Sequence, residues 1–170
     1  MTVKSFLKGF VYAGRGSAYC LAKERNMRIH LTFTVYMFGF LTVFDFFEIN
    51  KTEFAVLIAL CALVMSLEAV NTAIERAVDQ TSKEITELAR VAKDTAAGAV
   101  LIAAIASVVC GIIIMWQPEA FRAMFEYYKT HLWVFAILIL SIILSLFFIF
   151  HGKKRQGNEQ EMKTENKQDD

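Results

Sequence analysis

The chain has 170 residues, 56% of them hydrophobic, and a mean hydropathy of +0.43. This composition is too apolar for an ordinary soluble domain, and Pro118 is the single proline, as expected of long helices. The formal net charge is +1, and the three cysteines match neither a metal-binding spacing nor a disulfide framework. We therefore expect an all-α membrane protein, and we expect no nucleic-acid partner.

Residues 1–28 are predicted to form an amphipathic surface helix. The basic side chains of Lys4, Lys8 and Arg15 project within an arc of about 40°, and apolar side chains point to the opposite side. This arrangement is typical of a helix that lies in the headgroup region of a bilayer. If the helix continues without a break, Glu24 extends its apolar side and points toward the bundle.

Four apolar runs follow, and each approaches or reaches the ~20 residues that a helix needs to cross a hydrocarbon core. They are residues 29–44, 54–71, 96–116 and 132–150, and Asp45 limits the first. Basic residues are abundant before the first run, after the second and after the fourth, and fewer in the other two connections. By the positive-inside rule, both termini and the middle loop lie in the cytoplasm.

The runs divide the chain into five parts. After the surface helix we expect a three-span core at 29–116 with a cytoplasmic loop at about 76–93. An extracytoplasmic connection at 117–131 then leads to an additional transmembrane helix at 132–150. The tail at 151–170 has almost no apolar residues and is predicted to be disordered and cytoplasmic.

A polar stripe marks the end of the second run. At about 100° per residue, its members fall within an arc of about 100° on one helix face: Glu68, Asn71, Thr72, Glu75 and Asp79. A carboxylate inside or at the rim of a bilayer is expensive and indicates a functional site. The structural alternative is that Glu68 and Glu75 hold helices together and that Asp79 caps or solvates the helix end.

More ionisable groups are expected at the same cytoplasmic rim: Glu24, Arg28, Lys93 and Asp94. Carboxylates that converge at one depth repel unless a cation lies between them. Mg²⁺ accepts carboxylate oxygens and leaves room for phosphate oxygens and water. A nearby lysine and a spare glutamate as base complete the parts for phosphoryl transfer. The chain has no P-loop and no G-x-G-x-x-G motif, so ATP would bind in another way.

Three segments, in this order and spacing, resemble the signature of the prokaryotic diacylglycerol kinase family, which includes the undecaprenol kinases. They are Glu24-Arg25-Asn26-Met27-Arg28-Ile29-His30-Leu31, Glu68-x-x-Asn71-Thr72-Ala73-Ile74-Glu75-x-x-x-Asp79 and Ala92-Lys93-Asp94-x-Ala96-Ala97-Gly98-Ala99-Val100. The resemblance covers about residues 4 to 116. It implies a surface helix and three transmembrane helices per subunit, assembled as a homotrimer in the bacterial cytoplasmic membrane.

The resemblance also implies site residues. Glu68 is the expected general base and contacts the lipid substrate, and Glu24 and Glu75 are expected ligands of the Mg²⁺ that accompanies ATP. Asn71 and Asp79 are expected to support the site. The expected nucleotide contacts are Tyr12, Glu24, Glu75, Glu84, Lys93 and Asp94.

Arg28 is expected to contact the substrate or to pair with Glu24, and His30 is interpreted as an interfacial residue. Two positions depart from the family pattern. Ile85-Thr86 stand where the family usually has Tyr-His, and Ser5 stands near the place of a phosphate-contacting arginine, for which Lys4 or Lys8 would substitute. The fourth apolar run also lies outside the pattern.

The resemblance implies an ATP-dependent kinase that phosphorylates a membrane lipid alcohol. Undecaprenol is the favoured substrate because the motifs look closer to the undecaprenol kinase branch, and diacylglycerol is the alternative. A proton-coupled transporter with Glu68 as its proton site is the alternative of another class. A catalytically inactive scaffold is a third interpretation, against which the intact set of site residues argues.

Overall fold

The computed structural model describes residues 3–81 and 86–151. Within these ranges the chain forms six helices and their connections, without a strand, which confirms the predicted all-α fold. The helices are α1 (Val3–Lys23), α2 (Arg25–Val43), α3 (Lys51–Thr81), α4 (Glu87–Met115), α5 (Pro118–Thr130) and α6 (Leu132–Phe150).

Three of the described helices, α3, α4 and α6, are long and apolar enough to cross a membrane, by length and composition. They coincide with the second, third and fourth apolar runs and identify a membrane protein. The first run is also helical, as α2, but α2 is not among these three. Its first turns carry Arg25, Arg28 and His30, so a fourth span at α2 stays a prediction.

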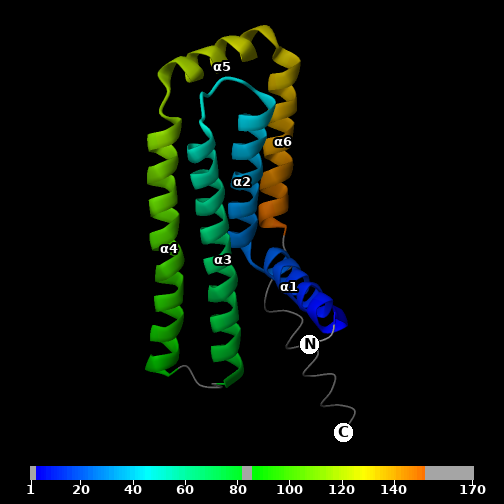
Figure 1. The fold of residues 1–170 in the computed structure, drawn as a ribbon, viewed down its shortest axis with the longest axis vertical. Coiled ribbons are helices and arrows are strands. Elements are labelled where there is room, and N and C mark those ends of the chain that lie inside the picture. The colour runs from blue at the N-terminus through cyan, green and yellow to red at the C-terminus, as the bar shows by residue number, and fades with distance from the viewer. Residues whose placement is uncertain (1–2, 82–85, 152–170) are drawn as a thin grey trace.

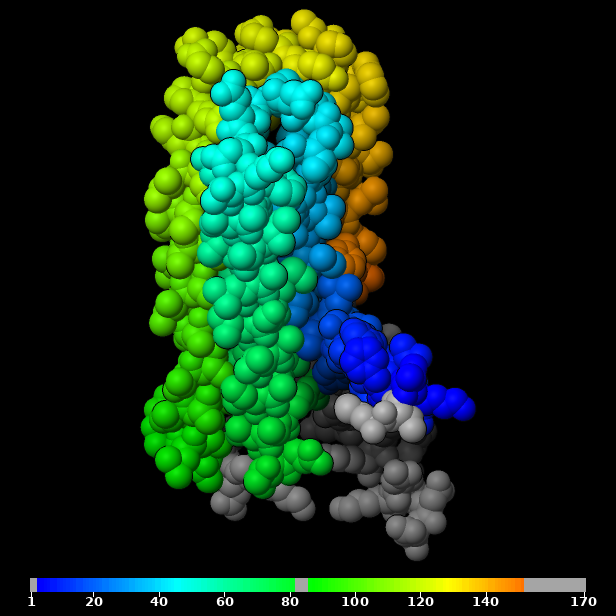
Figure 2. Space-filling model, viewed as in Figure 1, coloured from blue at the N-terminus to red at the C-terminus, as the bar shows by residue number. Residues whose placement is uncertain are grey.

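The helices form a flat bundle (Figure 1). α3 and α4 make the most extensive helix pair, α2 packs on α3, and α6 packs on α2. α5 crosses one end of the bundle, and α1 leaves it near the other end at an angle. The space-filling view shows α1 projecting from the side of the bundle (Figure 2). The α3–α4 pair extends beyond the last turn of α6 (Figure 1).

The surface helix ends earlier than residue 28. α1 ends at Lys23, Glu24 adopts an extended conformation (φ −99°, ψ 120°), and α2 begins with the next residue. The last carbonyls of a helix have no partner within it. Here Nη1 of Arg28 donates to the carbonyl oxygens of Leu21 and Ala22, both at 3.1 Å. The break at Glu24 is therefore stabilised by an arginine of the following helix.

Local capping sets the start of the two longest helices. At the start of α3, the Glu53 amide donates to Asn50 Oδ1 at 3.0 Å, and the Asn50 amide donates to Glu53 Oε2 at 2.9 Å. This reciprocal pair is a capping box. At the start of α4, Thr86 Oγ1 accepts from the amide of Ala89 at 3.2 Å. Thr86, which departs from the family pattern, thus has a structural function as an N-cap.

The connection at 117–131 is a helix, α5, which the sequence analysis did not predict. Pro118 occupies its first turn, where its missing amide costs no hydrogen bond. The Gln117 side chain binds the Glu48 backbone twice, accepting from its amide and donating to its carbonyl, both at 3.0 Å. Four aromatic rings pack between α5 and the connection from α2 to α3: Phe44, Phe46, Tyr127 and Tyr128.

Candidate functional site

Glu68 lies on α3 and is buried, with only 3% of its surface exposed. Its Oε1 is 3.6 Å from Nε2 of His30, which comes from α2. Thr72, one turn further along α3, donates to the backbone carbonyl of Glu68 at 2.9 Å and is equally buried. A buried carboxylate needs a charged or polar partner to offset the loss of water. The imidazole of His30 provides such a partner.

The sequence analysis interpreted His30 as an interfacial residue and did not connect it with Glu68. A titratable side chain inside the first apolar run was the available signal. The two residues lie on different helices, so only the packing of α2 on α3 brings them together.

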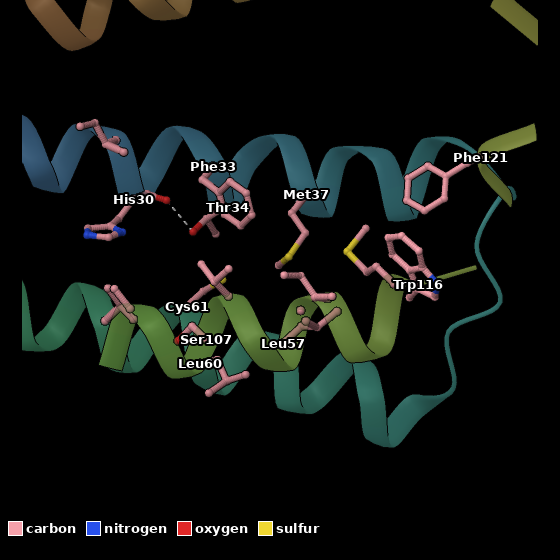
Figure 3. A pocket seen from close by; sticks show the side chains of 17 residues that line it. His30, Phe33, Thr34, Met37, Leu57, Leu60, Cys61, Ser107, Trp116 and Phe121 are labelled. Atoms are coloured by element: carbon pink, nitrogen blue, oxygen red, sulfur yellow. Dashed lines mark hydrogen bonds between the residues drawn. The ribbon is translucent and has the colours of Figure 1, made fainter. Parts of the chain in front are cut away.

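An apolar groove of about 580 Å³ runs between α2, α3 and α4 (Figure 3). His30 lies at one end and Trp116 and Phe121 at the other, with Met37, Leu57 and Ser107 among the residues between them. Val64 also lines the groove, and Glu68 follows it by one helical turn. The groove therefore leads toward the Glu68–His30 pair, and its lining is predominantly apolar.

Asn71 and Glu75 form a second polar pair on α3. Nδ2 of Asn71 donates to Oε1 of Glu75 at 3.1 Å. Among the described residues, the buried Oδ1 of Asn71 accepts no hydrogen bond. The predicted polar stripe therefore forms two separate contacts: Asn71 orients the carboxylate of Glu75, and Glu68 contacts His30.

Asp79 and Lys93 form an ion pair across the ends of α3 and α4. The side chains are 48% and 36% exposed, so the pair lies at the water-accessible end of the helix pair. Both are predicted site residues, and the structure brings them into contact.

Asp94 contacts Arg90, which the sequence analysis did not single out. Nη1 of Arg90 is 3.3 Å from Oδ2 of Asp94, and Nε of Arg90 donates to Glu87 Oε2 at 3.1 Å. These residues are spaced three and four positions apart on α4, which is the spacing of neighbouring side chains on a helix. The spacing alone would have indicated the cluster.

Arg28 is 5% exposed, and its described hydrogen bonds go to backbone carbonyls. Besides the two carbonyls at the end of α1, Nε donates to the carbonyl of Ile149 near the end of α6, at 3.1 Å. The expected contacts of Arg28 with substrate or with Glu24 stay predictions.

Two of the remaining predicted nucleotide contacts lie outside the ends of α3 and α4 that carry Asp79 and Lys93. Glu24 lies at the break between α1 and α2, Tyr12 is 62% exposed on α1, and Glu84 lies outside the described residues. Across 3–81 and 86–151, no group of three or more His, Cys, Asp or Glu side chains is arranged to hold a metal ion. Mg²⁺ commonly binds through one or two carboxylates together with phosphate oxygens of the substrate. The predicted ligands Glu24 and Glu75 match that number of carboxylates, and their function as Mg²⁺ ligands stays a prediction.

The chain is similar in sequence to known bacterial lipid kinases. The model of the family described as prokaryotic diacylglycerol kinase matches residues 11–115. The chain is 44% identical over 115 residues to a diacylglycerol kinase of Synechocystis sp., covering 67% of this chain and 64% of that protein. It is 39% identical over 111 residues to an undecaprenol kinase of Bacillus subtilis, covering 64% of this chain and 86% of that protein. A diacylglycerol kinase of Escherichia coli is 39% identical over 70 residues. The family match ends before α5 and α6.

Proposed function

The chain belongs to the prokaryotic diacylglycerol kinase family, and from that premise we propose that it is an ATP- and magnesium-dependent lipid kinase. It transfers the γ-phosphate of ATP to the hydroxyl of a membrane lipid alcohol. The observation that carries the proposal is the buried Glu68, paired with His30 at the end of an apolar groove. A hydroxyl at that end would have its hydrocarbon in the groove and a carboxylate beside it.

In the proposed reaction, Glu68 accepts the proton of the lipid hydroxyl as a general base. The hydroxyl oxygen forms a bond with the γ-phosphorus, and the bond from that phosphorus to the β–γ bridging oxygen breaks. ADP leaves, and Glu68 passes its proton to water. His30, 3.6 Å from Oε1, stabilises the charged carboxylate before the proton arrives.

The nucleotide is proposed to bind at the ends of α3 and α4 and at α1. Glu24 and Glu75 would hold Mg²⁺, and the amide of Asn71 orients Glu75. When bound, Mg²⁺ would neutralise part of the phosphate charge. Lys93 and Asp94 contact the nucleotide, with Asp79 supporting Lys93. Tyr12 and Glu84 are proposed as further nucleotide contacts, and Arg28 as a contact of the lipid head.

Undecaprenol is the proposed acceptor. The relative named undecaprenol kinase is matched over 86% of its length, more than the other two relatives described above. Diacylglycerol is the second candidate because the Synechocystis protein, named diacylglycerol kinase, has the higher identity of 44%. The three relatives are named kinases, which favours phosphoryl transfer over the proton-coupled transport that Glu68 alone would also allow.

The assembly and orientation are part of the proposal. We expect a homotrimer in the bacterial cytoplasmic membrane, with both termini in the cytoplasm. The surface helix, the three-span kinase core and the additional helix α6 follow the order of the predicted segments. The basic residues around the α3–α4 connection support its cytoplasmic location.

The test is transfer of labelled phosphate from ATP to undecaprenol and to diacylglycerol, side by side, in reconstituted protein. Glu68→Gln is expected to lower turnover by about 10²-fold to 10⁴-fold, the usual contribution of a general base. Glu75→Gln is expected to lower it by orders of magnitude as well. Glu126→Gln, the same substitution on α5, serves as the control. Absence of labelled lipid with both acceptors would contradict the kinase assignment.

A further inference from the structure

α6 lies outside the family match, yet one of its faces is fitted to α2. Ser141, Ser145 and Ile149 recur every four residues, so they share one face of the helix. Ile149 is 8% exposed, and the two serines are half-buried, whereas most of α6 is exposed. The packing partner of this face is α2 (Figure 1).

Hydrogen bonds join α2 and α6 at two positions along the helices. The Tyr36 hydroxyl lies 2.8 Å from Ser141 Oγ and 2.9 Å from Ser145 Oγ. Two turns earlier on α2, Nε of Arg28 donates to the carbonyl of Ile149. Polar contacts of this kind hold helices together in lipid, where burial of apolar surface gives little driving force. A helix that served as an anchor alone would not need them.

Arg28 connects this contact to the candidate site. Its guanidinium binds the last turn of α6 and the last turn of α1 together, through Ile149, Leu21 and Ala22. Its own backbone amide donates to the carbonyl of Glu24 at 3.4 Å. His30, the partner of Glu68, follows Arg28 by two residues.

We propose that α6 is a positioning element of the kinase site. Through Tyr36 and Arg28 it fixes the corner between α1 and α2, which carries the proposed magnesium ligand Glu24. The inference rests on the proposed function, since it concerns how that site is held in place. It assigns α6 a function in nucleotide binding, although α6 supplies no nucleotide contact.

Tyr36→Phe in the full chain is the test, because it removes one hydroxyl from a residue that is not among the predicted site residues. Thr42→Ala is the matched control: it also removes a hydroxyl from α2, but that hydroxyl binds carbonyls of its own helix, at Phe38 and Gly39. The Ser141→Ala/Ser145→Ala double variant removes the other side of the same contact. Adding it to Tyr36→Phe should therefore produce no further effect.

The first measurement does not depend on turnover. Cys20 is 6% exposed in the last turn of α1, and its carbonyl accepts from the Glu24 amide at 2.8 Å. A loosened corner is expected to expose it. Tyr36→Phe should raise the rate of Cys20 alkylation by a water-soluble maleimide, located by mass spectrometry, about threefold to tenfold. Thr42→Ala should leave the rate unchanged.

The second measurement is the KM for ATP, which does not change when only the folded fraction falls. Tyr36→Phe is expected to raise this KM about threefold to tenfold, with the KM for lipid unchanged. An active wild-type protein with the same KM for ATP in Tyr36→Phe would overturn the inference and leave the kinase assignment intact. A wild-type protein without phosphate transfer would overturn both.

Discussion

The contact between Glu68 of α3 and His30 of α2 is the central feature of the candidate site. Their separation of 3.6 Å exceeds the usual hydrogen-bond distance, so the pair is an ion pair when His30 is protonated. Glu68 is almost fully buried, whereas a quarter of the His30 side chain is exposed. Of the two side chains, His30 is the one that lines the groove.

The first prediction concerns this pair. His30→Ala is expected to lower turnover about tenfold, because Glu68 loses the partner that stabilises its charge. In a Glu68→Gln background the same substitution should have little further effect, since coupled residues are not additive. The measurement is kcat in the four proteins of the cycle, with His131→Ala as a control at the other end of the bundle. Equal losses in both backgrounds would mean that His30 acts independently of Glu68.

The polar residues of the site were predictable to different degrees. Glu68 and Glu75 follow from one helical stripe beside an apolar run, and the Asn71–Glu75 hydrogen bond follows from their spacing of four. The partner of Glu68 was not predictable in this way, because a periodic pattern describes one helix at a time. The capping of α1 by Arg28 was missed for the same reason.

At the scale of elements, the α3–α4 pair carries most of the proposed nucleotide site. The ion pair of Asp79 and Lys93 joins the two helices where they leave the apolar region. It therefore has two possible functions, to hold the helix ends together and to place Lys93 at the nucleotide. Exposed ion pairs contribute at most about 1 kcal/mol to stability, so the two functions are separable.

The second prediction exchanges the two charges. Asp79→Lys alone places two lysines together and should lower both stability and affinity for ATP. Adding Lys93→Asp restores the ion pair with reversed polarity, so thermal stability should return to that of the wild-type protein. The KM for ATP should stay raised, because the lysine now extends from α3. Recovery of both quantities would show that Lys93 has a structural function only.

The third prediction concerns the opposite end, where the Gln117 side chain binds the Glu48 backbone twice. Gln117→Ala should destabilise the protein by about 1–2 kcal/mol, because the two hydrogen bonds with the Glu48 backbone and a third to the Ile114 carbonyl are lost. Gln117→Glu keeps the acceptor and loses the donor, so it should cost less than Gln117→Ala. Thermal unfolding in detergent measures both, and the KM for ATP should not change. A raised KM for ATP would mean that the Gln117–Glu48 contact affects the nucleotide site.

Apolar runs predicted where α2, α3, α4 and α6 lie, and the fourth run matches α6 at both ends. α2 and α4 begin several residues before their runs, and α3 exceeds its run at both ends. α3 continues to Thr81, beyond the run, because its polar residues also form helix and the chain offers no earlier stop. α5 was missed because it is short and amphipathic, and its aromatic contacts with Phe44 and Phe46 come from a distant part of the chain. Such contacts are invisible to a search for long apolar segments.

For the whole molecule, the groove links the two ends of the bundle. It begins at His30 beside the proposed base and ends at Trp116 and at Phe121 of α5 (Figure 3). A hydrocarbon chain in this groove would lie parallel to the helices, as it does in a bilayer. The rings of Trp116 and Phe121 would then limit the length of lipid hydrocarbon that the groove encloses.

The fourth prediction fills the groove. A Cβ on Gly111, which lines it, would meet no atom within 4 Å, so a larger side chain would occupy the open space. Gly111→Trp is expected to raise the KM for lipid about tenfold, whereas Gly111→Ala should have little effect, because a methyl group excludes little hydrocarbon. Gly39→Trp is the control: its Cβ is equally unobstructed, and Gly39 is not among the groove residues. An unchanged KM in Gly111→Trp would place the lipid elsewhere.

The length of α3 has a consequence for the membrane itself. At 1.5 Å per residue its 31 residues extend about 46 Å, whereas a hydrocarbon core is about 30 Å thick. In the proposed reaction, this one helix would hold Glu68 at the depth of the lipid head and Glu75 further toward the cytoplasm. In a thicker bilayer, Glu68 would lie deeper in the membrane than the hydroxyl group of the proposed lipid substrate. For the proposed kinase, a change in the acyl-chain length of the membrane would therefore change the rate without any change in the sequence.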